Sequence, residues 1–393
     1  MARILFGWEL GANRGHIERL LPMAKRLLEQ GHEVALALQQ IDSAGLERDP
    51  RITLWQAPVW PRLLINNIQD GSRRVATMGD ILAQLGLDRP SCLAAMVSGW
   101  DTIFAAFRPD VVVADYAPAL LTAARGRVAT ISVGDYFSCP PYQLDRFPSL
   151  TGTPNAYDED ALLDTVDADL ASVGRAPLAG LPALFAADHV MVGSFAELDP
   201  YRMLRIGDYC APSIKLPLAD GGGGGGGDEL FVYAYNRMSA DNPIWAGLAA
   251  TRRTVRIHMG DPAPAHLDTF KRFGCIYEPK PLPFPLIARR SCVAISCGGN
   301  GFTSACLVAA LPQLMMPFDL EKLITARAVD ALGLGKMLGF NGLTADQVTD
   351  AVNELASDTG LSGKLRAVAP DFKSRMTVSM ANEVIACIAR LTG

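Results

Sequence analysis

A glycine-rich turn follows an apolar run in the second half of the chain, Val293-Ala294-Ile295-Ser296-Cys297-Gly298-Gly299-Asn300-Gly301-Phe302-Thr303-Ser304. The run predicts a buried strand, and residues 303–310 predict a helix that starts directly after the turn. Such a connection directs unpaired backbone N–H groups toward an anion, and its glycines let the backbone approach a phosphate. The hydroxyls of Thr303 and Ser304 add donors at the helix start. A tight turn without a ligand is the alternative, since short glycine patterns are weak evidence.

The segments after this turn extend the pattern. A short strand lies between prolines in residues 311–317, and Phe318-Asp319-Leu320-Glu321-Lys322 follows it. A predicted helix then runs to Leu332, before Gly333-Leu334-Gly335. From Ser296 to Gly335 the chain resembles, without a gap, the donor-binding half of glycosyltransferase family 1, the nucleotide-sugar enzymes of the GT-B fold.

The resemblance implies a set of donor-binding residues. In that family a histidine-glycine-glycine turn and the next helix hold the donor diphosphate, and an acidic-glutamine pair holds the sugar hydroxyls. The matching positions are Cys297, Gly298, Gly299, Asn300, Gly301, Thr303, Ser304, Asp319, Glu321 and Lys322, with His258 at the end of another predicted strand as a further candidate.

Three positions depart from the family pattern. Cys297 stands where the family has histidine, Lys322 where it has glutamine, and Ala305 where many members have glutamate. Lysine offers only donors and a positive charge. If Lys322 points into the pocket, it favours an acidic sugar; if it pairs with Glu321 or Asp319, it neutralises the pocket. Cys297 is either a nucleophile at a helix N-terminus or a packing residue, and we favour packing.

The start of the chain predicts a second strand–loop–helix unit. An apolar strand at residues 3–6 leads into a glycine-rich loop, Gly7 to His16, and then an amphipathic helix at residues 17–30 and another strand. This order predicts a parallel sheet with its ligands at the carboxyl ends of the strands. The loop lacks the G-x-G-x-x-G spacing of dinucleotide sites. It resembles the first loop of the same family, which Gly15-His16 and Gly31-His32 both match.

His16 and Asp115 are the candidate catalytic pair. Asp115 ends a predicted buried strand, Val111 to Ala114, so its side chain belongs to the sheet edge where the first loop lies. An aspartate there can fix the tautomer of an imidazole, whose other nitrogen takes a proton from a hydroxyl. In the family these positions are the general base and its partner, so we expect the two to be hydrogen-bonded. The alternatives are a surface or capping histidine and an aspartate that caps the helix from Ala117 onward.

No metal is expected. Asp167-Ala168-Asp169 spells the D-x-D pattern with which a different glycosyltransferase fold holds Mn²⁺, but it lies in an acidic helical stretch and is interpreted as a solvated face. The donor diphosphate would instead meet the helix dipole and backbone N–H groups.

Composition sets the broad class. The 393 residues are 49% hydrophobic and 20% charged, which suits a globular chain of two domains. A net charge of −5 gives no reason to expect nucleic acid. The eight cysteines have no metal-type spacing and indicate a reduced compartment. We see neither an export signal nor an apolar run able to span a bilayer, and expect a cytoplasmic protein of undetermined oligomeric state.

These observations give one prediction of fold and function. The order of strands and helices predicts an α/β fold, and the resemblance implies the GT-B arrangement of two facing Rossmann-like domains with a cleft between them. An acceptor domain, 1–217, precedes a linker, 218–228, that holds seven consecutive glycines, Gly221 to Gly227. The resemblance implies that residues 229–375 form a nucleotide-sugar domain and that a final helix, 376–393, packs back on the first domain.

The expected activity is inverting, metal-independent, hexosyltransferase-like transfer from a UDP- or dTDP-type sugar to a hydroxyl of a small, largely apolar acceptor, without a further cofactor. A nucleotide-sugar epimerase or hydrolase and an inactive partner protein are the alternatives. The departures at Cys297 and Lys322 favour the inactive protein, and the intact His16–Asp115 pair opposes it.

Overall fold

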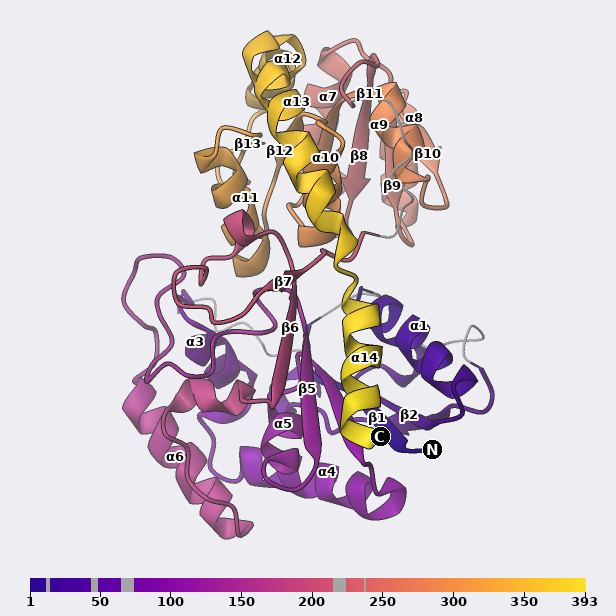
Figure 1. The fold of residues 1–393 in the computed structure, drawn as a ribbon. Helices are drawn as coiled ribbons and strands as arrows, with labels where there is room; N and C mark the ends of the chain where they lie inside the picture. Colours follow the sequence, from indigo (N-terminus) through magenta and orange to yellow (C-terminus); the bar gives the residue numbers. More distant parts are fainter. Residues whose placement is uncertain (12–14, 44–48, 65–73, 215–223, 237) are drawn as a thin grey trace. The chain divides into compact units, whose positions relative to one another are not determined.

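The computed structural model describes residues 1–11, 15–43, 49–64, 74–214, 224–236 and 238–393. The chain divides into two compact units, each built on one parallel sheet (Figure 1). The first comprises residues 1–193, 201–210 and 378–393, and the second comprises residues 194–200 and 211–377. The C-terminal helix therefore belongs to the first unit. Residues 12–14 of the first loop and Gly221 to Gly223 of the glycine run lie outside the described residues.

The first unit contains a seven-stranded sheet in the order β3-β2-β1-β4-β5-β6-β7. Its strands are β1 (Arg3–Trp8), β2 (Glu33–Leu38), β3 (Thr53–Gln56), β4 (Val111–Asp115), β5 (Ala129–Gly134), β6 (His189–Gly193) and β7 (Tyr209–Cys210). Its helices are α1 (Gly15–Glu29), α2 (Pro61–Leu64), α3 (Met78–Leu82), the π-helical η2 (Ala83–Leu87), α4 (Cys92–Phe107), α5 (Pro118–Ala124), α6 (Glu159–Ser172), the 3₁₀ turn η3 (Leu181–Phe185) and α14 (Met380–Thr392).

Alternation along the strands assigns the helices of this unit to two faces. Every second residue of β1 and β4, such as Phe6 and Val113, packs in one core with α1 and α14. On the opposite face of β1, a Cβ added at Gly7 would lie 2.1 Å from Leu120 and 3.0 Å from Trp100, so α5 and α4 pack directly against the strand there. Consecutive residues at the end of β1 therefore point to opposite faces of the sheet.

The second unit contains a six-stranded sheet in the order β10-β9-β8-β11-β12-β13. Its strands are β8 (Glu229–Ala234), β9 (Val255–Met259), β10 (Ile276–Glu278), β11 (Ser291–Ser296), β12 (Gln313–Met315) and β13 (Lys336–Met337). Its helices are the 3₁₀ turn η4 (Ala196–Leu198), α7 (Pro243–Ala250), α8 (Pro264–Arg272), α9 (Phe284–Arg290), α10 (Asn300–Val308), α11 (Leu320–Ala331), α12 (Ala345–Ser357), α13 (Thr359–Ser374) and the 3₁₀ turn η5 (Arg375–Thr377). Residues of α7, α8 and α12 form the core on one face of the sheet, and residues of α9 and α10 form the core on the other.

Gly86, inside η2, has a φ of 121° and interrupts the helical conformation before α4 begins. Two details differ from the sequence prediction. Helix α10 begins at Asn300, three residues before the predicted start, because Gly299 serves as its N-cap residue and Gly301 continues its first turn. Asp169 is buried rather than solvated, since its carboxylate accepts hydrogen bonds from the backbone N–H groups of residues 91, 93 and 94 at the start of α4.

Glu9 joins four parts of the first unit. Directly after β1, its fully buried carboxylate accepts hydrogen bonds from the indoles of Trp60 and Trp100, at 3.0 and 2.7 Å. The backbone N–H groups of Ala119 and Leu120, in the first turn of α5, donate at 3.1 and 2.6 Å. Burial outweighs these bonds and raises the pKa of Glu9 to about 7. The carboxylate thus fixes the end of β1 against α4 and α5.

This raised pKa predicts a pH dependence of folding. The folded protein holds the Glu9 proton more tightly than the unfolded chain, so its contribution to stability is lost as pH rises from about 4.5 to about 7. The loss is roughly 3 kcal/mol at about 1.4 kcal/mol per pH unit. In urea unfolding at several pH values, Glu9→Gln should flatten this dependence, while Glu33→Gln at an exposed site should keep it. The same slope in parent and Glu9→Gln would contradict the assignment.

Candidate functional site

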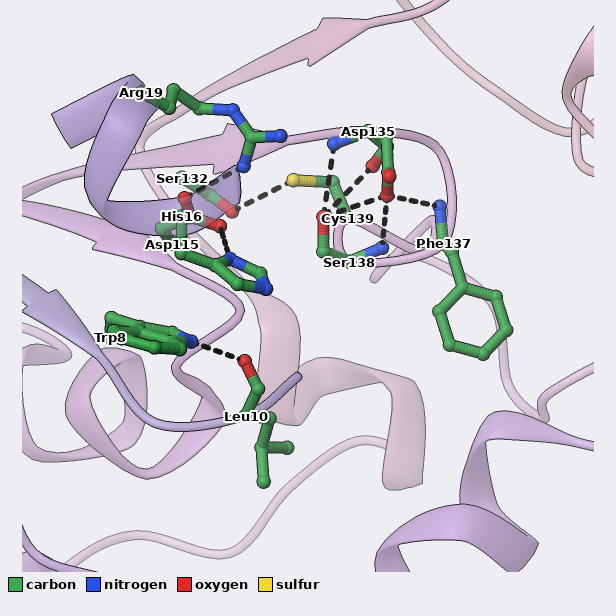
Figure 2. Close-up of polar contacts among 10 residues, drawn as sticks. All are labelled: Trp8, Leu10, His16, Arg19, Asp115, Ser132, Asp135, Phe137, Ser138 and Cys139. Carbon is green, nitrogen blue, oxygen red and sulfur yellow. Dashed lines mark hydrogen bonds and ion pairs between the residues drawn. The ribbon is translucent and has the colours of Figure 1, made fainter. Parts of the chain in front are cut away.

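The ends of β1 and β4 place two side chains on the α1 face of the sheet. Trp8 and Asp115 are paired in the parallel register, and both follow the alternation that faces α1. Helix α1 presents His16 and Arg19, which are three residues apart and therefore neighbours on one side of the helix. Figure 2 shows that these four side chains converge.

The expected hydrogen-bonded pair is confirmed. His16 Nδ1 lies 3.0 Å from Asp115 Oδ1, and Arg19 Nη1 donates to Oδ2 at 2.7 Å (Figure 2). The imidazole stacks on the indole of Trp8, with ring centroids 4.9 Å apart and planes inclined by 17°. The capping alternative for Asp115 is wrong, because the N-cap residue of α5 is Ala117 and receives no side-chain hydrogen bond.

Asp115 is held as an anion. Its side chain is fully buried, and burial alone would raise its pKa, but the charges of Arg19 and His16 and their hydrogen bonds hold the pKa below its ordinary value. A carboxylate only accepts hydrogen bonds, so the Nδ1 atom of His16 must donate. The lone pair of a neutral His16 ring then lies on Nε2, for which the described residues supply no partner. That nitrogen can take a proton.

Gly11 lies close to this nitrogen. Its φ is 88°, a conformation that favours glycine, and an added Cβ would stand 2.3 Å from His16 Nε2. A side chain at this position would collide with the imidazole ring of His16. Trp8, the last residue of β1, orients the His16 ring by stacking on it, and the lack of a side chain at Gly11 leaves room for Nε2.

The loop after β5 completes the surroundings of the pair. Asp135 Oδ1 accepts hydrogen bonds from the backbone N–H groups of Phe137 and Ser138 and from the Ser138 hydroxyl (Figure 2). Cys139 Sγ lies 3.5 Å from the hydroxyl of Ser132, and burial raises the pKa of its thiol to about 12. Cys139 is therefore a neutral packing residue at neutral pH.

In the second unit, the predicted anion-binding turn lies at the start of α10. Gly298 has a φ of 88°, and its N–H donates to the Ser296 hydroxyl at 3.1 Å. Asn300 Oδ1 accepts from the hydroxyls of Ser194 and Ser304, at 3.2 and 3.4 Å, so these side chains are engaged within the protein. What the turn can offer an anion is the backbone N–H groups of the first turn of α10.

Thr303 is the fourth residue of α10, one residue before Ser304. Its hydroxyl is buried and has no hydrogen-bond partner among the described residues.

Gly301, in the first turn of α10, has no room for a side chain, because an added Cβ would lie 2.8 Å from the Ser213 carbonyl oxygen. Gly301 therefore serves close packing within this unit.

Cys297 is a packing residue. Its side chain is fully buried, and burial raises the pKa of its thiol to about 11, although Lys322 and a hydrogen bond with the Tyr235 hydroxyl lower it. The thiolate that a nucleophile requires is therefore scarce at neutral pH.

The acidic residues after β12 hold Lys322. Asp319 is the N-cap residue of α11 and accepts from the backbone N–H of Lys322 at 3.0 Å. The ammonium group lies 2.7 Å from Glu321 Oε2 and 3.4 Å from Asp319 Oδ2. Burial would lower the pKa of Lys322, but the two carboxylates outweigh it and hold the pKa above its ordinary value. The structure thus matches the second of the two predicted arrangements, in which Lys322 pairs with the carboxylates of Glu321 and Asp319.

His258 belongs to an aromatic stack. Its Nδ1 lies 2.9 Å from the Glu278 carbonyl oxygen, which links β9 to β10. Its ring stacks on Tyr233 at 5.6 Å, and Tyr233 stacks on Phe302, in the first turn of α10, at 5.4 Å. Through these rings His258 supports the start of α10.

Sequence reasoning missed Arg19, Trp8 and Glu9. The spacing of Arg19, three residues after His16 on a predicted helix, was a usable signal. Within the described ranges, no three His, Cys, Asp or Glu side chains are grouped to hold a metal ion. No helix of the described part is long and apolar enough to cross a membrane.

Comparison with known proteins identifies the fold. No family model matches the sequence. A sterol 3-beta-glucosyltransferase of Komagataella phaffii is 26% identical over 106 residues, which is 27% of this chain and 9% of that protein. Three of the similar solved structures are glycosyltransferases: CalG4, the calicheamicin glycosyltransferase; VinC, in complex with dTDP; and UGT2 of Phytolacca americana, complexed with UDP-2-fluoro-glucose and pterostilbene.

The structural agreement extends over whole chains. CalG4 has a TM-score of 0.71 and 18% identity and covers 100% of this chain and 99% of its own. VinC has a TM-score of 0.63 and 14% sequence identity, and the match covers 99% of each chain. UGT2 has a TM-score of 0.62 and 15% sequence identity, and the match covers 100% of each chain. These matches confirm the GT-B glycosyltransferase fold.

Proposed function

We propose that this chain, having the GT-B fold, transfers a sugar from a nucleoside diphosphate sugar to a hydroxyl group of a small, largely apolar acceptor. The hydrogen bond between His16 and Asp115 carries the proposal, because it leaves Nε2 as a base at the carboxyl edge of a parallel sheet. Two similar proteins support the acceptor class, since UGT2 is complexed with pterostilbene and the Komagataella phaffii protein is a sterol 3-beta-glucosyltransferase.

The proposed reaction is a single displacement with inversion. His16 Nε2 takes the proton of the acceptor hydroxyl as the oxygen attacks the anomeric carbon from the side opposite the diphosphate. The new carbon–oxygen bond forms, the bond to the diphosphate oxygen breaks, and the nucleoside diphosphate leaves with the electron pair. Asp115 stabilises the imidazolium that forms. Proton transfer of this kind contributes about 10² to 10⁴ in rate.

The donor diphosphate is proposed to bind at Gly298 to Ser304. The N–H groups and dipole of α10, a helix of nine residues, would meet its charge without a metal ion. A UDP- or dTDP-type donor is supported by the complexes of VinC with dTDP and of UGT2 with UDP-2-fluoro-glucose. Because Lys322 already pairs with Glu321 and Asp319, we propose that the sugar is neutral rather than acidic.

Gly299→Val should remove nucleotide binding while leaving the fold intact. Gly299 has an ordinary φ of −65°, and its added Cβ would meet nothing closer than the Tyr235 hydroxyl at 3.9 Å, so the fold tolerates a side chain that blocks the N–H groups. Calorimetry with UDP and dTDP should show at least about a tenfold loss, or 1.4 kcal/mol. Gly339→Val, at a glycine with open space around it, is the matched control. Unchanged affinity in Gly299→Val would move the donor site elsewhere.

His16→Ala should lower turnover by about 10² or more, because the base is lost. Turnover is measured with a panel of neutral and acidic UDP- and dTDP-sugars, apolar alcohols and phenols as acceptors, and EDTA present throughout. His189→Ala, on β6, is the control and should retain activity. Product NMR should show an inverted anomeric configuration.

Other results of the same assay would reject the proposal. Release of free sugar without an acceptor product would indicate a hydrolase, and no reaction with any donor would indicate an inactive partner protein. Equal turnover of parent and His16→Ala with one acceptor would reject His16 as the base.

A further inference from the structure

Arg19 contacts the carboxylate on which His16 depends. We propose that Arg19 is a positioning residue that keeps Asp115 ionised, so that His16 stays unprotonated and available as a base. The inference rests on the proposed function, because it requires His16 to be the base.

The two oxygens of Asp115 are divided between two partners. Oδ1 faces His16 Nδ1, and Oδ2 accepts from Arg19, whose side chain is 13% exposed. Without a neighbouring cation, a buried carboxylate beside an imidazole would favour the uptake of one proton by the two groups, either on the carboxylate or on the imidazole. An imidazolium carries a proton on Nε2 and cannot act as a base. Since an arginine is always charged, Arg19 balances Asp115 without that proton.

Stability alone does not account for Arg19. A buried ion pair adds little net stability, because both charges lose their hydration. The Nε of Arg19 is also buried and has no partner among the described residues, which adds to the cost of burying the side chain. What Arg19 supplies is a fixed positive charge 2.7 Å from the carboxylate.

The other groups around His16 and Asp115 do not balance the negative charge of Asp115. Asp135, after β5, attracts Arg19 by its charge, while its Oδ1 atom is bound within its own turn. The Cys139 thiol is neutral because burial raises its pKa. Arg205 donates to the backbone carbonyl of Cys139, and Trp8 from β1 does not titrate. Among the described contacts, Arg19 is the cation hydrogen-bonded to Asp115.

The pH profile of kcat/KM separates a charge effect from a packing effect. In Arg19→Met the acidic limb should move to higher pH by about one unit, so activity falls about tenfold at low pH and recovers at high pH. Arg19→Lys, which keeps the charge, should restore the limb. Arg26→Met on the exposed side of the same helix should match the parent. A uniform loss at every pH, with the limb in its original place, would overturn the inference.

A second readout does not need activity. With ¹⁵N-labelled histidine, the pH at which the His16 ring takes up a proton should rise in Arg19→Met relative to the parent. An unchanged midpoint in the folded variant would overturn the role of Arg19. If Arg19→Met does not fold, Arg19→Gln, which keeps hydrogen bonding without charge, takes its place with the same expectation. Lack of sugar transfer by the parent would instead reject the proposed function and leave this measurement valid.

Discussion

The buried carboxylate of Asp115 is the group around which the first unit's site is assembled. A fully buried anion is costly unless charged or hydrogen-bonded groups surround it. Asp115 has both, an arginine on one oxygen and an imidazole on the other. Its ionisation fixes which nitrogen of His16 carries the proton, and thus which nitrogen can accept one. The proposed chemistry depends on that assignment.

The fold makes this arrangement possible through strand alternation. Trp8 and Asp115 are register partners on adjacent strands and point to the α1 face, whereas Glu9, the next residue, points to α4 and α5. Glu9 and Trp8 therefore secure the end of β1 from opposite sides of the sheet. Glu9, directly after β1, is hydrogen-bonded to α4 and α5, and Trp8, the last residue of β1, stacks on His16. Two consecutive residues thus set the position of the base.

The parallel sheets and the pairing of His16 with Asp115 could be predicted from the sequence. Apolar runs and helix periodicity predicted two parallel sheets, and the strand-end positions of His16 and Asp115 predicted their contact. Sequence patterns are local, so they do not predict most contacts between residues that lie far apart in the chain. They could not show that α10 begins at Asn300, with Gly299 as its N-cap residue. Nor could they show that Asp169 caps α4 across 78 residues of sequence.

The candidate site shows the same limit. The pairing of Lys322 with Glu321 and Asp319 was one of two open arrangements, and side-chain geometry was needed to choose between them. Glu9 followed a strand without any recognised motif, so its four hydrogen bonds, which come from three distant segments, were invisible in the sequence.

The tautomer of His16 is the most direct test of the central claim. In the protein labelled with ¹⁵N-histidine, long-range ¹H–¹⁵N spectra distinguish a protonated from an unprotonated ring nitrogen, and loss of signals in His16→Ala assigns them. Neutral His16 is expected to carry its proton on Nδ1, toward Asp115, and to have a free lone pair on Nε2. A neutral ring with its proton on Nε2 would contradict the assignment of His16 as the base.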